Sequence, residues 1–236
     1  MDVTKQDHIK AVKQFVIKYL NDTNSILWGI VNNAGFAIAG QFELIPKEYD
    51  NLQRNVLLNG PINIIREFLP LIHGRKEYKL NQSDGARDGG RIINIASCYS
   101  KMIGDCRYGV CKAALSYFTH ALRLELWPRF GICTCSIEPG GYNTNIWQNS
   151  IIWAQKINNT QLMDIYQFDI DKLKLLIEKI PSITHHSFDP VVDDVIHGLT
   201  SKYPQKEYQP GWNWIITICA YGPFFVTQRL NAFFSR

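Results

Sequence analysis

The sequence lacks the features that mark several common classes of protein. Its six cysteines form no C-x-x-C pair and its histidines form no cluster with zinc-ligand spacing, so we expect no metal site. It has no block of lysines and arginines, and its formal net charge is only +4, so we expect no nucleic-acid partner. No unbroken apolar run reaches the roughly 18 residues that a membrane-spanning helix needs.

The two ends of the chain carry little sign of export or of a membrane anchor. Residues 1–10 are polar and charged, so we expect no secretory signal and no secretion. The most apolar stretch, Trp212–Val226, is broken at Tyr221–Pro223 and favours a segment of the core or of a substrate pocket. A helix that lies in a membrane surface, with Trp212 and Trp214 at the interface, is the alternative.

What is present is the patterning of one α/β domain. The 236 residues are 46% apolar and 19% charged, which is typical of a chain that buries a core. Apolar and β-branched runs predict buried strands at residues 26–31, 91–97 and 131–141. Apolar residues at helical spacing predict helices at residues 7–20, 46–70 (one long helix or two in sequence) and 108–126. Strands that alternate with helices predict a doubly wound parallel sheet with helices on both faces.

Polar side chains and glycines follow the three predicted strands. Asn32–Gly35 follow the first strand, Ser97 ends the second, and Pro139–Thr144 close the third. A predicted helix starts at Tyr108 and carries Lys112 one turn later. Each motif is ordinary alone, because a serine can cap a helix, a Pro-Gly pair can form a turn and a Tyr-x-x-x-Lys pair can lie on a helix surface. Ligands of parallel sheets bind at the carboxyl ends of the strands, so together the motifs predict a site there.

In this order and placement the motifs resemble the short-chain dehydrogenase/reductase family, over essentially the whole chain. The segment "YGVCK" is similar to the family's Tyr-x-x-x-Lys motif, with Ser97 upstream; "NNAG" is similar to its sheet-stabilising turn on the cofactor side, and "PGGYNT" to its nicotinamide loop. The segment "LWGIVNNAG" and five late residues resemble the branch that handles retinol and hydroxysteroids: Tyr203, Pro204, Tyr208, Gly211 and Trp212. The resemblance implies a Rossmann-like fold and an oxidoreductase that uses NAD or NADP.

The chemistry of alcohol oxidation suggests a role for each catalytic residue. A free tyrosine titrates near pKa ~10, which is too high for a base at neutral pH. Lys112 would place a cation beside Tyr108, lower its pKa and hold the cofactor's ribose, and Ser97 would hydrogen-bond the substrate oxygen. The family's fourth residue, an asparagine that links the lysine to solvent through a water, is Asn55 in our interpretation. Asn59 is the alternative, and neither stands at the usual spacing before the following glycine.

The resemblance also implies a set of cofactor contacts and one absence. The contacts come from several segments: Asp2, Val3, Asn33, Ala34, Gly35, Tyr108, Lys112, Pro139, Gly140 and Thr144. The glycine-rich turn that holds the pyrophosphate has no counterpart, since no G-x-x-x-G-x-G occurs anywhere in the sequence.

By resemblance the chain starts at the end of the family's third strand, which implies that the first βαβ half is missing. Residues 26–31 would then form an apolar sheet edge. A fragmentary gene model, a splice form and a degenerate protein each explain this. The presence of every other motif in order favours a fragmentary gene model.

We therefore expect a single, incomplete domain over residues 1–236, with a substrate lid at 145–202 and an apolar segment at 203–236. The expected activity is NAD(P)-dependent interconversion of an alcohol and a carbonyl on an apolar, retinol- or steroid-like substrate. We expect the protein in the cytoplasm or on a face of the endoplasmic reticulum membrane, with peripheral membrane association through residues 203–236. We also expect a homodimer that forms through the long helices. The alternative is an inactive family member that serves as an interaction or dimerisation module.

Overall fold

The described residues form a four-stranded parallel sheet at the centre of the fold. The computed structural model describes residues 1–38, 40–73, 89–146, 149–150, 165–166, 171, 175 and 184–222. The strands lie side by side in chain order: β1 (Gly29–Asn32), β2 (Arg91–Ile95), β3 (Cys133–Ile137) and β4 (Glu207–Tyr208). Every neighbouring pair is parallel, so the predicted parallel sheet is confirmed.

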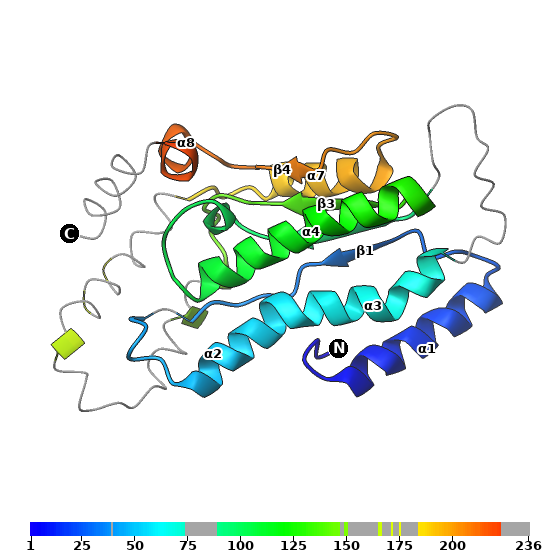
Figure 1. Ribbon diagram of the computed structural model, residues 1–236, viewed down its shortest axis with the longest axis horizontal. Helices are drawn as coiled ribbons and strands as arrows, with labels where there is room; N and C mark the ends of the chain where they lie inside the picture. Colours follow the sequence, from blue (N-terminus) through cyan, green and yellow to red (C-terminus); the bar gives the residue numbers. More distant parts are fainter. Residues whose placement is uncertain are drawn as a thin grey trace.

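Helices cover both faces of this sheet (Figure 1). On one face lie α3 (Gly60–His73) and α4 (Tyr108–Phe130), and α1 (Gln6–Asp22) packs along α3. On the other face α7 (Asp189–Thr200) packs against β2 and β3, and the short helix α8 (Trp214–Tyr221) follows β4. The arrangement is the Rossmann-like, doubly wound fold that the sequence predicts.

Consecutive residues of β2 point to opposite faces of the sheet. Ile92 packs with Phe68 of α3 and Leu126 of α4, whereas Ile93 packs with Val195 of α7 and with β4. Both isoleucines are fully buried. A sheet that is covered on both sides has strands that read as continuous apolar runs, which explains the β-branched character of this segment.

The helix predicted at residues 46–70 consists of three consecutive helical pieces. The α-helix α2 spans Lys47–Arg54, a π-helical turn η1 spans Asn55–Asn59, and α3 follows directly. A π turn closes hydrogen bonds over five residues instead of four, so it shifts the direction in which its side chains point. Leu57 is 1% exposed in this turn, whereas its first and last residues, both asparagines, are exposed.

Strand β1 is the outer strand of the sheet within the described residues, where it pairs with β2. Val31 in this strand is 42% exposed and Ile26 just before it is 51% exposed. The apolar edge that the sequence predicts is therefore present among the described residues. That a first βαβ half is missing stays a prediction.

The two predicted segments toward the end of the chain are described in part. Most of the lid at 145–202 lies outside the described residues, and its last part forms α7. Of the segment at 203–236, β4 and α8 are described and residues 223–236 are not. Among the described residues, no helix combines the length and the apolar character needed to cross a membrane.

Candidate active site

The carboxyl ends of β2 and β3 lie side by side and carry two of the predicted motifs. The Ala96 amide donates to the Ile137 carbonyl at 2.7 Å, and the Cys98 amide donates to the Pro139 carbonyl at 2.9 Å. Ser97 lies between these two bonds and is 8% exposed. The register of the sheet thus brings Ser97 next to the turn that contains Pro139 and Gly140.

Tyr108 begins α4 and faces the segment that follows β2. The Asp105 carboxylate accepts a hydrogen bond from the Tyr108 amide at 2.7 Å and so caps the start of the helix. The Tyr108 ring meets the Tyr99 ring edge-on, with 5.9 Å between their centres. Burial raises the pKa of the Tyr108 hydroxyl, and its hydrogen bond with Ser97 acts in the opposite direction. The lowering of this pKa that we expect from Lys112 therefore has to overcome the cost of burial.

Lys112 reaches the same place from one turn further along α4. Its Nζ donates to the carbonyl of Ile95, the last residue of β2, at 2.7 Å, and lies 5.7 Å from the centre of the Tyr108 ring. The side chain is 5% exposed, and burial lowers the pKa of Lys112 to about 8. The bond to Ile95 uses one of the three N–H groups of the ammonium.

Gly35 lies next to the Lys112 ammonium. A Cβ atom at Gly35 would stand 3.9 Å from Lys112 Nζ and 3.2 Å from Leu57 Cδ2. Asn33 and Ala34 are exposed, as Gly35 is, so this segment borders solvent next to the lysine. The side chain of the π turn that lies next to Gly35 is the apolar Leu57.

Asn55, the predicted relay residue, lies on the outer side of the π turn. It is exposed, and its Oδ1 accepts a hydrogen bond from Asn59 Nδ2 at 2.8 Å. Both asparagines line a surface pocket together with Thr4 and Arg66. A contact between Asn55 and Lys112 is not among those of the described residues, so the relay stays a prediction.

Asp2 and Val3, the predicted contacts on the adenine side, lie at the start of the fold. Asp2 Oδ1 accepts from the amide and the hydroxyl of Thr4 at 2.9 and 2.7 Å, and these bonds lower the pKa of Asp2. Val3 is 8% exposed and packs closely on the start of α3, where a Cβ at Gly60 would stand 2.9 Å from its Cγ2. The Asp2 carboxylate is thus hydrogen-bonded within its own turn, to Thr4.

The turn at Pro139 and Gly140 fits tightly against the loop after β4. The Gly140 amide donates to the Pro210 carbonyl at 2.9 Å, and a Cβ at Gly140 would stand 2.3 Å from the Gly211 carbonyl oxygen. No side chain therefore fits at this position. Thr144, at the end of the predicted nicotinamide loop, accepts a hydrogen bond at 3.3 Å from the amide two residues later.

These groups suit one end of a dinucleotide. Tyr108 and Ser97 carry hydroxyl groups, and Lys112, which lies next to Gly35, carries an ammonium group. This donor set matches ribose oxygens and a reacting alcohol or carbonyl. The sequence holds no glycine-rich turn whose amides could bind the pyrophosphate. The donor set therefore fits the nicotinamide-ribose end of NAD or NADP.

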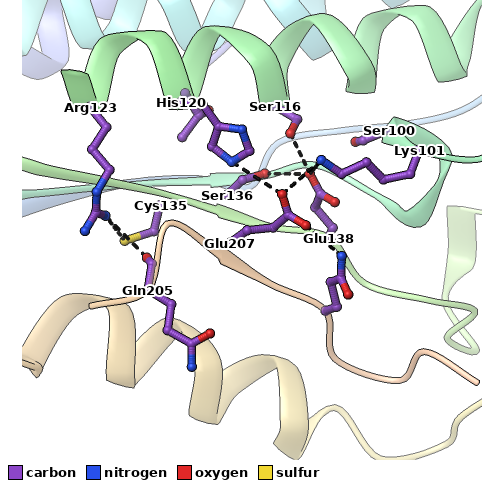
Figure 2. A network of polar contacts seen from close by, with 12 residues as sticks. Ser100, Lys101, Ser116, His120, Arg123, Cys135, Ser136, Glu138, Gln205 and Glu207 are labelled. Atoms are coloured by element: carbon purple, nitrogen blue, oxygen red, sulfur yellow. Dashed lines mark hydrogen bonds and ion pairs between the residues drawn. The ribbon is translucent and has the colours of Figure 1, made fainter. Parts of the chain in front are cut away.

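A polar network surrounds the buried Glu138, the residue before Pro139 (Figure 2). Glu138 is 0% exposed, and its Oε1 accepts from Ser116 Oγ at 2.5 Å and from Ser136 Oγ at 3.2 Å. Lys101 Nζ lies 3.9 Å from the same oxygen and 2.9 Å from Glu207 Oε2. The sequence predicts none of these partners. The available signal is the carboxyl group at the end of a buried strand, since such a group needs hydrogen-bond donors.

A second chain of polar groups crosses the sheet beside the site. Asn32 Nδ2 donates to Asn94 Oδ1, and Asn94 Nδ2 donates to Thr119 Oγ1 on α4, both at 2.8 Å. All three side chains are buried. The first asparagine of "NNAG" thus ties β1 to β2 and α4, which agrees with the sheet-stabilising role that the resemblance implies.

The fold and the site define a class of protein. The family model for short chain dehydrogenases matches residues 1–155, which include all three strands that carry the predicted motifs. The chain belongs to the short-chain dehydrogenase family.

Within this family the chain is similar to steroid and retinol dehydrogenases. It is 29% identical to estradiol 17-beta-dehydrogenase 2 of Mus musculus over 94% of this chain and 58% of that protein. It is 31% identical to retinol dehydrogenase 7 of Mus musculus, over 90% of this chain and 65% of the relative. For 17-beta-hydroxysteroid dehydrogenase type 2 of Homo sapiens the identity is 31%, over 93% of this chain and 55% of that protein. The chain thus spans between 55% and 65% of the length of these curated relatives.

Solved structures agree on the fold. A short-chain dehydrogenase from Streptomyces avermitilis superposes with a TM-score of 0.65 at 20% identity, over 99% of this chain and 74% of that one. The aldohexose dehydrogenase of Thermoplasma acidophilum gives a TM-score of 0.64 at 17% identity, over 89% of this chain and 75% of that one. At these identities the likeness shows the fold alone.

Proposed function

We propose that this chain carries the catalytic site of an NAD(P)-dependent oxidoreductase that interconverts an alcohol and a carbonyl on an apolar substrate. The observation that supports this most is the convergence of three groups at the carboxyl ends of β1 and β2. The Tyr108 hydroxyl hydrogen-bonds with Ser97, Lys112 Nζ lies 5.7 Å from the Tyr108 ring centre, and Gly35 lies next to the same ammonium. This is where an α/β sheet binds its ligand.

In the proposed reaction Tyr108 is the acid/base group. It takes the hydroxyl proton when the alcohol is oxidised and returns it when the carbonyl is reduced. Lys112 favours the phenolate form by its charge and holds ribose hydroxyls with its remaining N–H groups. Ser97 donates a hydrogen bond to the substrate oxygen and stabilises the charge that develops there. Lys112 would hold an oxidised nicotinamide cofactor by its ribose, and that cofactor would supply the hydride acceptor.

The proposed substrates are retinol- or steroid-like alcohols and ketones. The support is the similarity to proteins named estradiol 17-beta-dehydrogenase 2 and retinol dehydrogenase 7. Both NAD and NADP are candidates. We further propose peripheral membrane association through α8, whose Trp214 is 67% exposed. The proposed location is a face of the endoplasmic reticulum membrane or the cytoplasm.

Replacing Tyr108 with phenylalanine tests the proposal. Tyr108→Phe keeps the ring and removes the hydroxyl that carries the proton, so we expect turnover of retinol or estradiol to fall at least about 100-fold. The measurement is nicotinamide absorbance with NAD and with NADP. Tyr99→Phe is the matched control, because it removes the hydroxyl of the neighbouring ring and should leave turnover within about twofold.

Unchanged turnover in Tyr108→Phe would remove this tyrosine from the reaction. A titration that follows nicotinamide fluorescence tests the cofactor separately. If the chain shows no saturable binding of either nucleotide, the oxidoreductase proposal fails for this form of the protein.

A second candidate function is self-association, which α4 favours. Val110, Tyr117 and Leu124 are 63%, 77% and 79% exposed and recur every seven residues along this helix. Seven residues bring a helix back to nearly the same direction, so the three side chains form one exposed apolar stripe, called here the α4 stripe. A second copy of the chain can cover such a stripe around a twofold axis. A homodimer or an inactive dimerisation module would both use this surface.

A further inference from the structure

We propose that Glu138 is a positioning residue whose buried side chain holds the Ser97 segment and the Pro139 turn in register with the helix that carries Tyr108 and Lys112. This inference rests on the proposed function, because the groups that it positions are those of the proposed site. Nothing in the local sequence pattern requires a carboxyl group there, since the strand before it, β3, is apolar or small throughout: Cys133, Thr134, Cys135, Ser136 and Ile137.

The first link runs from Glu138 to α4. Ser116 lies one helical turn after Lys112, on the side of α4 that faces β3, and its hydroxyl donates to Glu138 Oε1 at 2.5 Å. Both partners are almost completely buried, at 0% and 3% exposure. A hydrogen bond between a hydroxyl and a carboxyl group in such surroundings is short, directional and costly to leave unmade. It therefore fixes the distance between α4 and the end of β3 near the proposed site.

The second link runs through the backbone of Glu138 and its neighbour. The Glu138 amide donates to the Tyr208 carbonyl of β4 at 2.8 Å, and its carbonyl accepts from Trp212 Nε1 at 2.6 Å. The next carbonyl along the chain, that of Pro139, accepts from the Cys98 amide at 2.9 Å. A displacement of Glu138 is thus transmitted directly to the residue that follows Ser97.

The third link is electrostatic and runs through Lys101, at the end of the short helix η2 (Cys98–Ser100) that follows Ser97. Its ammonium lies between two carboxyl groups, 3.9 Å from Glu138 Oε1 and 2.9 Å from Glu207 Oε2. His120 Nε2 on α4 faces Glu207 at 3.5 Å. Figure 2 shows these side chains pointing toward one another from α4, from η2 and from the strands. Glu138 is the member of this group that contacts α4 by a short hydrogen bond.

The alternative is that Glu138 stabilises the fold without acting on the site. A matched control links the preceding strand, β3, to the same helix, because the Thr134 hydroxyl donates to the Thr119 carbonyl at 2.6 Å and both residues are fully buried. Ser116→Ala removes the link at the site, and Thr134→Val removes a comparable strand-to-helix link at the other end of β3. A positioning role predicts different effects on the site, and a purely structural role predicts similar ones.

The test uses the full chain and two readouts. By hydrogen exchange, we expect the Cys98 and Gly140 amides to exchange about five- to tenfold faster in Ser116→Ala than in Thr134→Val, the effect of one hydrogen bond. By steady-state kinetics, we expect Ser116→Ala to lower kcat about tenfold with a smaller change in KM, and Thr134→Val to leave both nearly unchanged. Glu138→Gln keeps an acceptor oxygen for Ser116 and should retain most of kcat, whereas Glu138→Leu should lose it.

The two proposals fail in different ways. Equal exchange at Cys98 and Gly140 in Ser116→Ala and Thr134→Val overturns the positioning role, whatever the activity. Faster exchange in Ser116→Ala together with no turnover in the wild-type chain supports the positioning role and contradicts the proposed function. If Glu138→Leu does not fold, Ser116→Ala and Glu138→Gln still decide the matter.

Discussion

At the scale of single residues, burial changes the ionisation of the site. Tyr108 and Lys112 are packed between α4 and the sheet, and burial moves both toward their neutral forms. For Tyr108 this raises the pKa, and for Lys112 it lowers the pKa to about 8. Lys112 still carries its charge at pH 7, because its pKa of about 8 lies above that value. The proposed reaction also uses the phenolate form of Tyr108, so the partner charges within the site have to lower the pKa that burial raises.

The lowered pKa of Lys112 predicts how stability depends on pH. The unfolded chain keeps the ordinary value of 10.5, so the folded protein binds fewer protons between about pH 8 and 10.5, and its stability rises with pH in that window. Lys112→Met removes the buried charge and should raise the free energy of unfolding at pH 7 by about 2 kcal/mol, after allowing for the lost hydrogen bond. The gain should shrink as the pH approaches 10.5.

Urea unfolding at pH 7 and at pH 10 measures this difference. Lys101→Met is the contrasting control. Burial lowers the pKa of Lys101, but the hydrogen bond to Glu207 and the charge of Glu138 outweigh it and leave the pKa raised. That variant should lose stability at pH 7. A Lys112→Met gain that is equal at both pH values would contradict the prediction.

At the scale of elements, one π turn decides which side chains face the site. The helical path through α2, η1 and α3 carries two asparagines and two leucines within five residues. An α-helical turn and a π turn orient these residues differently, since one inserted residue rotates the helix by about 100°. In the structure Leu57 faces the space beside Lys112, and Asn55 and Asn59 face outward. The helical spacing of the sequence predicts the helix and does not predict the insertion.

The turn after β3 gives a prediction at the same scale. Gly140→Ala would bring a Cβ to 2.3 Å from the Gly211 carbonyl oxygen, whereas Gly141→Ala meets only the Thr184 Cγ2 atom, at 3.3 Å. We expect Gly140→Ala to cost about 1–3 kcal/mol in the free energy of unfolding. The cost of Gly141→Ala should stay below about 1 kcal/mol. Urea midpoints of the two variants provide the comparison, and equal midpoints would show that the turn can move aside.

At the scale of the whole molecule, two of the apolar surfaces that are exposed among the described residues are candidates for association. One is the edge of β1, with Val31 exposed, and the other is the α4 stripe. They lie on different parts of the fold, since β1 is the outer strand of the described sheet and the stripe consists of exposed residues of α4, which packs on β3. Exposed apolar surface of this kind favours association.

A charge in the α4 stripe should change the state of assembly. Tyr117→Glu and Leu124→Glu place a carboxylate where a second copy would pack, so we expect the weight-average mass in sedimentation to fall from dimer toward monomer. Phe15→Glu on α1 is the control, because Phe15 is equally exposed at 71% and lies outside the stripe. If the stripe variants and the control sediment alike, the stripe is not the interface.

Much of the fold was predictable because its signals are local. The apolar run at 91–97 and the helical spacing at 108–126 depend on residues close in sequence, and they form β2 (Arg91–Ile95) and α4 (Tyr108–Phe130). The pair Tyr108 and Lys112 was predictable for the same reason, since a spacing of four residues fixes their relative placement on a helix. The ends of the elements were less predictable, since the strand predicted at 26–31 is β1 at Gly29–Asn32.

By itself the sequence determined the alternation of strands and helices, the parallel sheet and the order in which the motifs reach its edge. The tertiary structure alone decided which distant groups meet: Ser116 with Glu138, Cys98 with Pro139, and Lys112 with the Ile95 carbonyl. It also decided that Leu57 of the π turn lies beside Gly35. The reason is physical. Periodicity along a chain reports the face of each element, but contacts across elements depend on the register of the sheet and the rotation of each helix, which packing of the whole core sets.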